Sequence, residues 1–139
     1  MPVTLDDDAR RTLALFEEVT GASGVDCVRE NGRLLVVVAR GGMREAIGPR
    51  GQHVERFESR IGTSVRLIEA ADDPEAFVAN ALTPAAVYNV TISENDDTVA
   101  YVEVATEDRG VAIGSGGETI EAARTLAARH FDIDDVQLV

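Results

Sequence analysis

The chain of 139 residues carries 25 acidic and 13 basic side chains, which gives a formal net charge of −12 at pH 7. Its length allows one ordinary domain or two very small ones, and its 45% hydrophobic residues are enough to fold either. No apolar run is long enough to span a membrane, and the N-terminus lacks the pattern of a signal peptide, so we expect a soluble cytoplasmic protein. The single cysteine, Cys27, has no partner for an internal disulfide and is expected to be a small core residue.

The distribution of charge separates the two halves of the chain. All thirteen basic residues are arginines, and a lysine-free acidic composition resembles the proteins of salt-loving archaea. Residues 1–66 hold ten arginines and ten acidic residues, whereas residues 67–139 hold three arginines and fifteen acidic residues, so the second half carries the whole net charge. A polyanionic partner is therefore expected to prefer the first half.

The first copy of an internal repeat begins with a helix. We expect this helix to open at Thr4, with Asp7 as its capping partner, and to end near Gly21; its apolar face consists of Ala9, Leu13 and Phe16. Strands are expected at 24–30 and 33–40, joined by an Asn-Gly turn. The second of these is apolar on both faces, which is typical of a central strand. A short helix through Ile47, a glycine loop, a helix over 52–61 and a strand over 63–70 follow.

The second copy repeats this order. It begins with Asp73 as a helix cap and Pro74 as the first helical residue, with Phe77 and Ala81 facing inward. Strands are expected at about 86–93 and 98–104. A helix, a second glycine loop, a helix from 117 with three inward residues and a last strand complete the copy; the inward residues are Ile120, Ala123 and Ala127.

The repeat itself is visible in the letters. The stretch AIGPRG at 46–51 returns sixty-six positions later as AIGSGG at 112–117, and LLVVVA at 34–39 falls on AYVEVA at 100–105. This self-similarity indicates a duplication, with domains at 1–70 and 71–139. Between two helices, Gly-x-x-Gly lets the backbone turn sharply and approach a ligand closely. The amides and dipole of the helix that follows suit a phosphate.

The order helix, strand, strand, helix, Gly-x-x-Gly, helix, strand resembles the type II KH domain, and two in tandem over the whole chain resemble the archaeal NusA-like transcription factors. The resemblance implies an α+β fold of two KH units, each a three-stranded sheet covered by helices on one face. It also implies a non-enzymatic factor in transcription elongation, termination or antitermination. Such domains hold about four nucleotides of single-stranded RNA, with phosphates at the loop and bases in an apolar groove.

Carried over by position, the resemblance implies RNA-binding residues in both units. In the first unit they are Ile47, Gly48, Pro49, Arg50, Gly51, His53 and Val54. In the second unit they are Ile113, Gly114, Ser115, Gly116, Gly117 and Ile120. The candidates for the apolar groove wall are Ile47 and Val54 in the first unit, and Ile113 and Ile120 in the same places of the second.

One arginine distinguishes the two loops. KH loops that bind RNA usually carry a basic residue; the first loop has Arg50, and the second has none. Three further arginines, Arg44, Arg56 and Arg60, lie on the flanking helices and would extend a phosphate-facing patch. The alternative is that they pair with Glu45, Glu55 and Glu58 on a solvated face. His53 starts a helix near the expected phosphate but could also be idle, and His130 suits the negative end of its helix.

The sequence lacks the residues that several other classes of function require. A phosphate loop of the NTPase kind needs a lysine, and the strand-helix-strand units are too short for a dinucleotide fold. We expect no catalytic residue, metal site, cofactor or small-molecule substrate. The serious alternative is a protein-interaction module that docks on RNA polymerase or another transcription factor. The two functions could also divide the molecule, with RNA on the first unit and protein on the acidic second unit.

Overall fold

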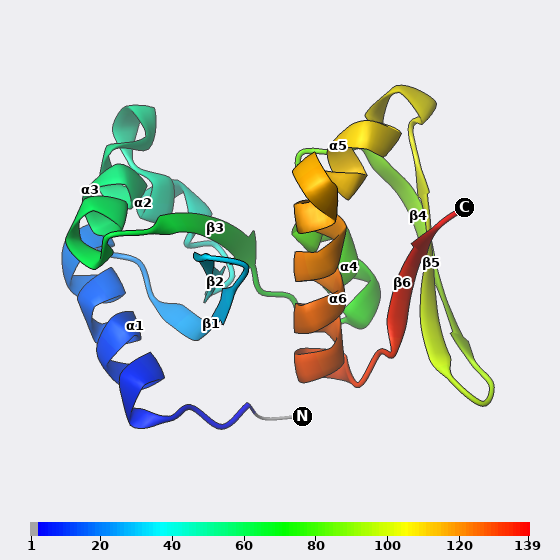
Figure 1. Cartoon of the computed structure of the whole chain (residues 1–139), viewed down its shortest axis with the longest axis horizontal. Helices are drawn as coiled ribbons and strands as arrows, with labels where there is room; N and C mark the ends of the chain where they lie inside the picture. The colour runs from blue at the N-terminus through cyan, green and yellow to red at the C-terminus, as the bar shows by residue number, and fades with distance from the viewer. Residues whose placement is uncertain (1–2) are drawn as a thin grey trace. The chain divides into compact units, whose positions relative to one another are not determined.

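The computed structural model describes residues 3–139, and its internal contacts divide the chain into two compact units, one covering Thr4–Ala70 and the other Ala71–Val139 (Figure 1). Each unit combines three helices with a three-stranded sheet, so the fold is α+β. None of the helices in the described residues is long and apolar enough to cross a membrane.

The elements of the two units follow the same order. The first unit contains α1 (Asp7–Thr20), β1 (Gly24–Glu30), β2 (Arg33–Val38), α2 (Met43–Ile47), a 3-10 turn (Pro49–Gly51), α3 (Gln52–Ile61) and β3 (Ser64–Glu69). The second contains α4 (Pro74–Ala81), β4 (Val87–Glu94), β5 (Thr98–Val104), a 3-10 turn (Thr106–Asp108), α5 (Arg109–Ile113), a second 3-10 turn (Ser115–Gly117), α6 (Glu118–Phe131) and β6 (Asp135–Leu138).

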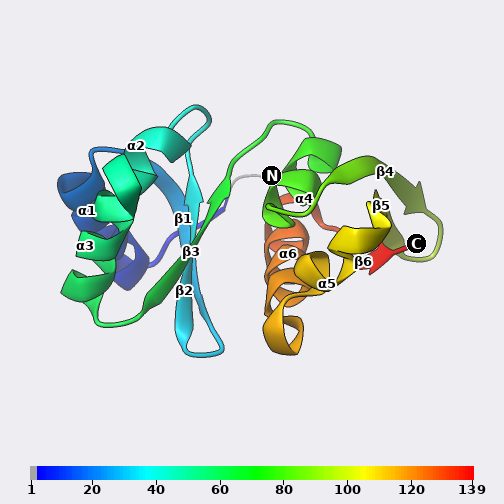
Figure 2. The same ribbon diagram turned by 90° about the horizontal axis from the view of Figure 1, so that it is seen from above.

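Both sheets are mixed and have the same topology. β1 and β2 form an antiparallel hairpin, and β3 joins β2 in parallel; β4, β5 and β6 repeat this arrangement. The Asn-Gly prediction for the first hairpin is confirmed, because Asn31 and Gly32 have φ angles of 51° and 77°, the two positive values that a tight hairpin turn requires. In both views the helices of a unit lie on one side of its own sheet (Figures 1 and 2).

Aromatic side chains anchor the core of each unit. In the first, the rings of Phe16 and Phe57 meet edge to face with their centroids 5.1 Å apart, over the inward residues of β2. In the second, Phe77 of α4 packs against Phe131 of α6, with ring centroids 5.3 Å apart. β2 is buried along its length from Leu34 to Val38 and is the central strand of its sheet, as its apolar pattern predicted.

Helix α1 begins later than its sequence predicts. The N-cap is Asp6, whose carboxylate accepts a hydrogen bond from the Ala9 N–H at 2.8 Å, so the helix begins at Asp7 and not at Thr4. Three consecutive aspartates offered several equivalent caps, and the pattern of apolar residues could not choose among them. The predicted cap of α4 is confirmed: Asp73 accepts from the Ala76 N–H at 2.9 Å.

Candidate nucleic-acid interface

The two glycine loops adopt the same backbone conformation. The first glycine of each loop, Gly48 or Gly114, has φ and ψ of 74° and 174° or 82° and 170°. The last glycine, Gly51 or Gly117, is left-handed, with φ of 76° or 79°. In both loops its N–H donates to the carbonyl of the first glycine at 3.1 Å. The two copies of the sequence motif therefore also share their backbone conformation.

The first glycine of each loop is required by both its backbone and its neighbour. A φ near +75° with an extended ψ is a region that is essentially restricted to glycine. A Cβ on Gly48 would also collide with the imidazole ring of His53, and a Cβ on Gly114 with the side chain of Thr119. His53 and Thr119 occupy the same position in the two copies, as the second residues of α3 and α6 respectively.

His53 joins the two helices that flank the first loop. Its Nδ1 lies 2.6 Å from the carbonyl oxygen of Glu45 in α2. Because a carbonyl can only accept, Nδ1 carries the proton and donates it. This contact was not foreseen in the sequence, and it gives His53 a definite structural role. The side chain fixes the end of α2 against the start of α3 and so sets the shape of the loop.

Arg50 occupies a backbone conformation that disfavours its side chain. Its φ and ψ are 56° and 25°, in the left-handed region, and the second loop has Gly116 at the same position with 61° and 18°. A non-glycine residue there costs roughly 1 to 2 kcal/mol. The first loop thus keeps an arginine at a point where the fold favours glycine.

The helix that follows each loop begins without a capping side chain, as far as residues 3–139 show. Backbone N–H groups in a first helical turn have no partner within the helix, and they lie at the positive end of its dipole. The starts of α3 and α6 therefore offer backbone donors of the kind that an anion requires, and anion binding there stays a prediction.

Apolar side chains border the loops unequally. Ile47 and Ile113, the residues just before the loops, are 40% and 41% exposed, and Val54 is half-buried in α3. Ile120 differs from its predicted place in a groove wall: it is only 6% exposed and belongs to the core of the second unit. The same helical spacing that marked Ile120 as inward had already favoured this outcome.

The arginines around the first loop are exposed and unpaired. In the described part of the chain, no ion pair joins Arg44, Arg50, Arg56 or Arg60 to a carboxylate. All four are exposed. One carboxylate that could have paired with them is used elsewhere, since Glu58 accepts a hydrogen bond from the Val65 N–H of β3 at 2.8 Å. The alternative of a self-paired surface does not hold, and the loop and its two flanking helices together carry four cations with no ion pair among the described residues.

The second unit uses its arginines differently. Arg109 donates to the carbonyl of Val139 at 2.9 Å. Arg124 is paired with Glu121 and Asp135, and its Nε also donates to a backbone carbonyl of β6. In the matched windows 44–56 and 110–122, three arginines and two glutamates give +1, whereas two glutamates alone give −2. Of the two windows, only the one in the first unit has a net positive charge.

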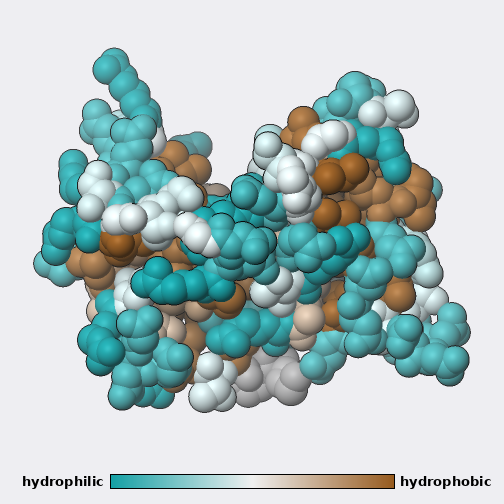
Figure 3. Space-filling view, viewed as in Figure 1, coloured by the Kyte–Doolittle hydropathy of each residue, from teal (hydrophilic) through white to brown (hydrophobic). Residues whose placement is uncertain are grey.

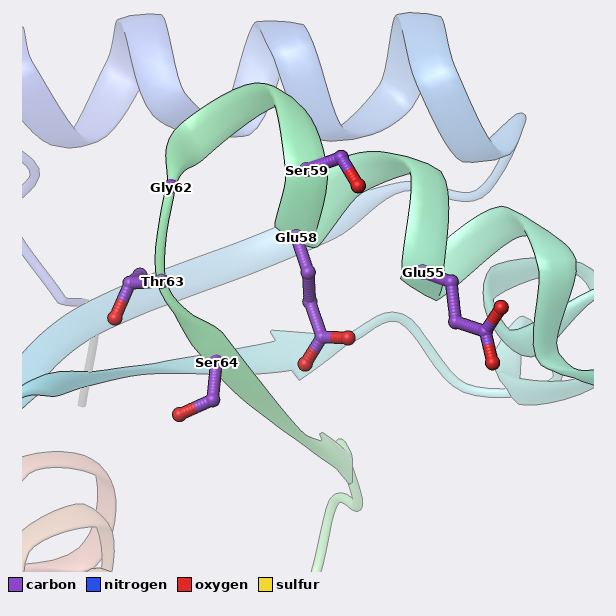
Figure 4. A pocket seen from close by; sticks show the side chains of 6 residues that line it. All are labelled: Glu55, Glu58, Ser59, Gly62, Thr63 and Ser64. Atoms are coloured by element: carbon purple, nitrogen blue, oxygen red, sulfur yellow. The ribbon is translucent and has the colours of Figure 1, made fainter.

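A shallow hollow between α3 and β3 has a different character. Its lining is acidic and hydroxylic and includes Glu55, Glu58, Ser59, Gly62, Thr63 and Ser64 (Figure 4). Glu58 holds β3, as described above, and the Thr63 hydroxyl donates to the Gly32 carbonyl at 2.7 Å. Two carboxylates disfavour a phosphate in this hollow.

The remaining reactive side chains are structural. Cys27 is buried, and burial, followed by the charge of Asp26, raises the pKa of its thiol from 9.0 to about 11, which keeps it protonated. Its predicted core position is confirmed. His130 lies in the last turn of α6, where a histidine complements the helix dipole, and its ring is 5.3 Å from that of Phe77. No cluster of three or more metal-ligating side chains occurs in the residues the structure describes.

The chain is similar in sequence and in fold to known proteins. Residues 74–138 match the family described as the NusA-like second KH domain. The chain is 57% identical over 138 residues to a protein of Halobacterium salinarum and 60% identical to one of Halococcus morrhuae, with 99% of each chain covered in both cases. Both relatives are named probable transcription termination protein NusA. The crystal structure of APE1850 aligns with 97% of this chain over 100% of its own length, with a TM-score of 0.87 and 24% sequence identity. This match shows a similar fold.

Proposed function

This chain belongs to the NusA family of transcription termination proteins, and from that membership and the geometry of its first loop we propose that it is a single-stranded RNA-binding factor acting in transcription termination or antitermination. The observation that carries the proposal is Arg50, held in a left-handed conformation inside a loop whose two flanking helices carry arginines with no ion pair to a carboxylate in the described residues. The relatives come from halophilic archaea, as the lysine-free acidic composition predicted.

We propose further that the chain is a tandem of two type II KH domains, 1–70 and 71–139. The element order of both units, the matching loop geometry and the family match over 74–138 support this division. Because the two loops share their backbone, a difference in RNA binding between the units must come from side chains. Charge is the side-chain property in which the loops differ most.

RNA would bind the first unit through short-range contacts. Phosphates would lie on the loop at Gly48–Gly51, accept hydrogen bonds from the start of α3 and meet the guanidinium of Arg50. Pro49 fixes the backbone before Arg50, and His53 holds the loop against α2. Bases would stack against the apolar side chains of Ile47 and Val54.

The salt of a halophilic cytoplasm makes this short-range character necessary. At molar salt the screening length is about 3 Å, so long-range attraction of the RNA to the protein is weak. Affinity must then come from donors at hydrogen-bond distance and from apolar contact. The exposed Ile47 and the loop amides meet this requirement, whereas the more distant Arg56 and Arg60 contribute less as salt rises.

The family name supports an activity at the transcription complex, and we propose RNA polymerase as the protein partner there. Termination and antitermination both act on a transcript as it leaves the polymerase. A factor that holds the transcript therefore gains from a contact with the polymerase, because linking two weak contacts raises the effective affinity of each.

Exchange of loop charges tests the RNA-binding proposal. Arg50→Glu, or aspartate at both Pro49 and Arg50, should lower the affinity for short single-stranded RNA by roughly 1 to 3 kcal/mol, the scale of a lost charge-assisted contact with added repulsion. Aspartate at both Ser115 and Gly116 is the matched control and should cost less than about half as much. Filter binding in high potassium chloride measures both, after circular dichroism shows that the variants fold. RNA binding no tighter than duplex DNA binding, or a loss in the second loop alone, would overturn the proposal.

A further inference from the structure

The imidazole of His53 has one nitrogen engaged and one nitrogen open. Its Nδ1 lies 2.6 Å from the carbonyl oxygen of Glu45, and no other hydrogen bond, ion pair or ring contact involves His53 within residues 3–139. The side chain is half-buried, but Nε2 is not among the buried polar atoms that lack a partner in the part of the chain that the structure describes. Nε2 is therefore open to solvent.

The bond to Glu45 decides what Nε2 can do. Because a carbonyl oxygen only accepts, the proton of the neutral ring lies on Nδ1, and Nε2 keeps a lone pair. A neutral His53 thus presents a hydrogen-bond acceptor to solvent, and this nitrogen has no proton to donate to an anion. It differs in this from Arg50, whose guanidinium has only donors.

The ring lies beside the first glycine of the loop. A Cβ on Gly48 would collide with Cγ of His53 and would lie 2.7 Å from both Cδ2 and Nδ1, so the imidazole packs directly against this glycine. In the view of Figure 3, the part of the first unit where the loop between α2 and α3 lies is mainly hydrophilic. Nε2 is therefore an acceptor at a polar surface, next to the backbone that would hold a phosphate.

A sugar-phosphate chain offers few partners to such an acceptor. The oxygens of its phosphates and ester links all accept hydrogen bonds, and they would oppose the lone pair of Nε2. Within the chain, the 2′-hydroxyl of ribose is the one backbone group that can donate. Each 2′-hydroxyl adjoins a phosphate, so a strand with a phosphate on Gly48–Gly51 brings ribose hydroxyls close to the ring.

We propose that His53 makes the first loop selective for ribose over deoxyribose, because its Nε2 accepts a hydrogen bond from a ribose 2′-hydroxyl. This inference rests on the proposed RNA binding of the first unit, and it names the group of the RNA that is recognised beside the loop. DNA lacks this hydroxyl and would leave Nε2 without a partner. The second unit has Thr119 at this position, and its hydroxyl both donates and accepts, so the second loop would not make the distinction.

Two probes test the proposal: a short single-stranded RNA, and the same sequence with fluorine in place of every 2′-hydroxyl. Fluorine removes the donor but keeps an RNA-like sugar, so the comparison isolates the hydrogen bond. Fluorescence anisotropy measures both affinities in high potassium chloride at about pH 8.5, above the range in which an imidazole ordinarily changes its charge. The original chain should bind the hydroxyl strand roughly three- to tenfold more tightly, the range of one net hydrogen bond.

His53→Thr is the matched variant, because Thr119 packs against Gly114 in a loop of the same backbone conformation. A thermal midpoint close to that of the original chain would show that it folds. Any loosening of the loop affects both strands alike, so the ratio of the two affinities reports the hydroxyl contact alone. This ratio should fall to about one in His53→Thr. In Arg50→Glu, both strands should bind more weakly with their ratio retained.

Equal binding of the two strands by the original chain would overturn the inference and leave the RNA-binding proposal standing. A preference that His53→Thr retains in full would also overturn it, because another residue would then contact the hydroxyl. The nitrogen-15 signals of the imidazole need no variant: the Nε2 signal of His53 should shift when the hydroxyl strand is added and stay in place with the fluorinated strand, and equal shifts would contradict the contact. A chain that binds neither strand would remove the proposed function, and this inference with it.

Discussion

Replacing Arg50 with glycine should separate the stability of the first loop from its function. The substitution gives the first loop the residue that the second loop has at the same backbone angles. Relief of the left-handed conformation is worth roughly 1 to 2 kcal/mol to the folded state. The added freedom of glycine in the unfolded chain offsets roughly 0.5 to 1 kcal/mol of this. The net change in the free energy of unfolding should therefore lie between zero and about 1.5 kcal/mol of stabilisation.

RNA affinity should move in the opposite direction. The variant retains the loop amides and the apolar side chains but loses the guanidinium, and a hydrogen bond to a charged group contributes about 1.5 to 3 kcal/mol. A loss of about tenfold or more in affinity follows. Denaturant unfolding gives the stability, and fluorescence anisotropy of a labelled short RNA gives the affinity, both at the same high salt. A variant that binds RNA as tightly as the original chain, or one that is less stable, would refute the reasoning.

Three further predictions concern residues that fix the two units. Gly48→Ala should destabilise the protein by more than about 2 kcal/mol, because it adds a collision with His53 to backbone strain. Gly62→Ala is the control: Gly62 also has a positive φ but has open space around it, so the substitution should cost only about 1 kcal/mol. Equal losses of stability in the two variants, measured by denaturant unfolding, would contradict the role of the collision. The free energy of unfolding should fall as the pH rises from 9 to 11, since the unfolded chain loses the Cys27 proton first, and Cys27→Ala should lack this part of the fall in denaturant titrations at each pH. The pKa of Asp135 is lowered mainly by a hydrogen bond from the Gln137 side chain, so Asp135→Asn should destabilise the protein at neutral pH. The difference in thermal midpoint between this variant and the original chain should narrow as the pH falls below 3.8, because Asp135 then becomes protonated. A difference that stays constant with pH would contradict this prediction.

The fold was open to prediction because local signals and the repeat agreed with each other. The Asn31-Gly32 turn fixed the first hairpin, Asp73 and Pro74 marked the start of α4, and the spacing of Phe16 and Phe57 gave the inward faces of two helices. The sixty-six-residue offset then transferred each element to the other copy. Agreement between independent local signals is what lets a short sequence predict its fold.

The parts of the site that escaped prediction depend on contacts and not on spacing. Sequence placed Arg56 and Arg60 beside glutamates but could not show that Glu58 holds the backbone of β3. It gave the place of His53 without its bond to Glu45. Arg50 itself does not indicate a left-handed conformation. The only signal for it in the sequence is Gly116, the glycine at the same position of the second copy.

The solvent exposure of individual side chains is the other property that the sequence did not predict. Val111 and Ile113 have the pattern of ordinary helical residues, and only the structure shows that they are 42% and 41% exposed. Ile120 showed the reverse, since a residue carried over as a groove wall is buried. The periodicity of a five-residue helix is too short to tell an inward face from an outward one.

A titration of the full chain with short single-stranded RNA, followed residue by residue through backbone amide signals in high potassium chloride, tests the central claim most directly. We expect the amide signals of Ile47, Gly48, Arg50 and Gly51 to shift as RNA is added, while those of Gly114–Gly117 change little. Shifts confined to the second loop, with the first loop unmoved, would contradict the assignment of RNA binding to the unit that carries the arginine.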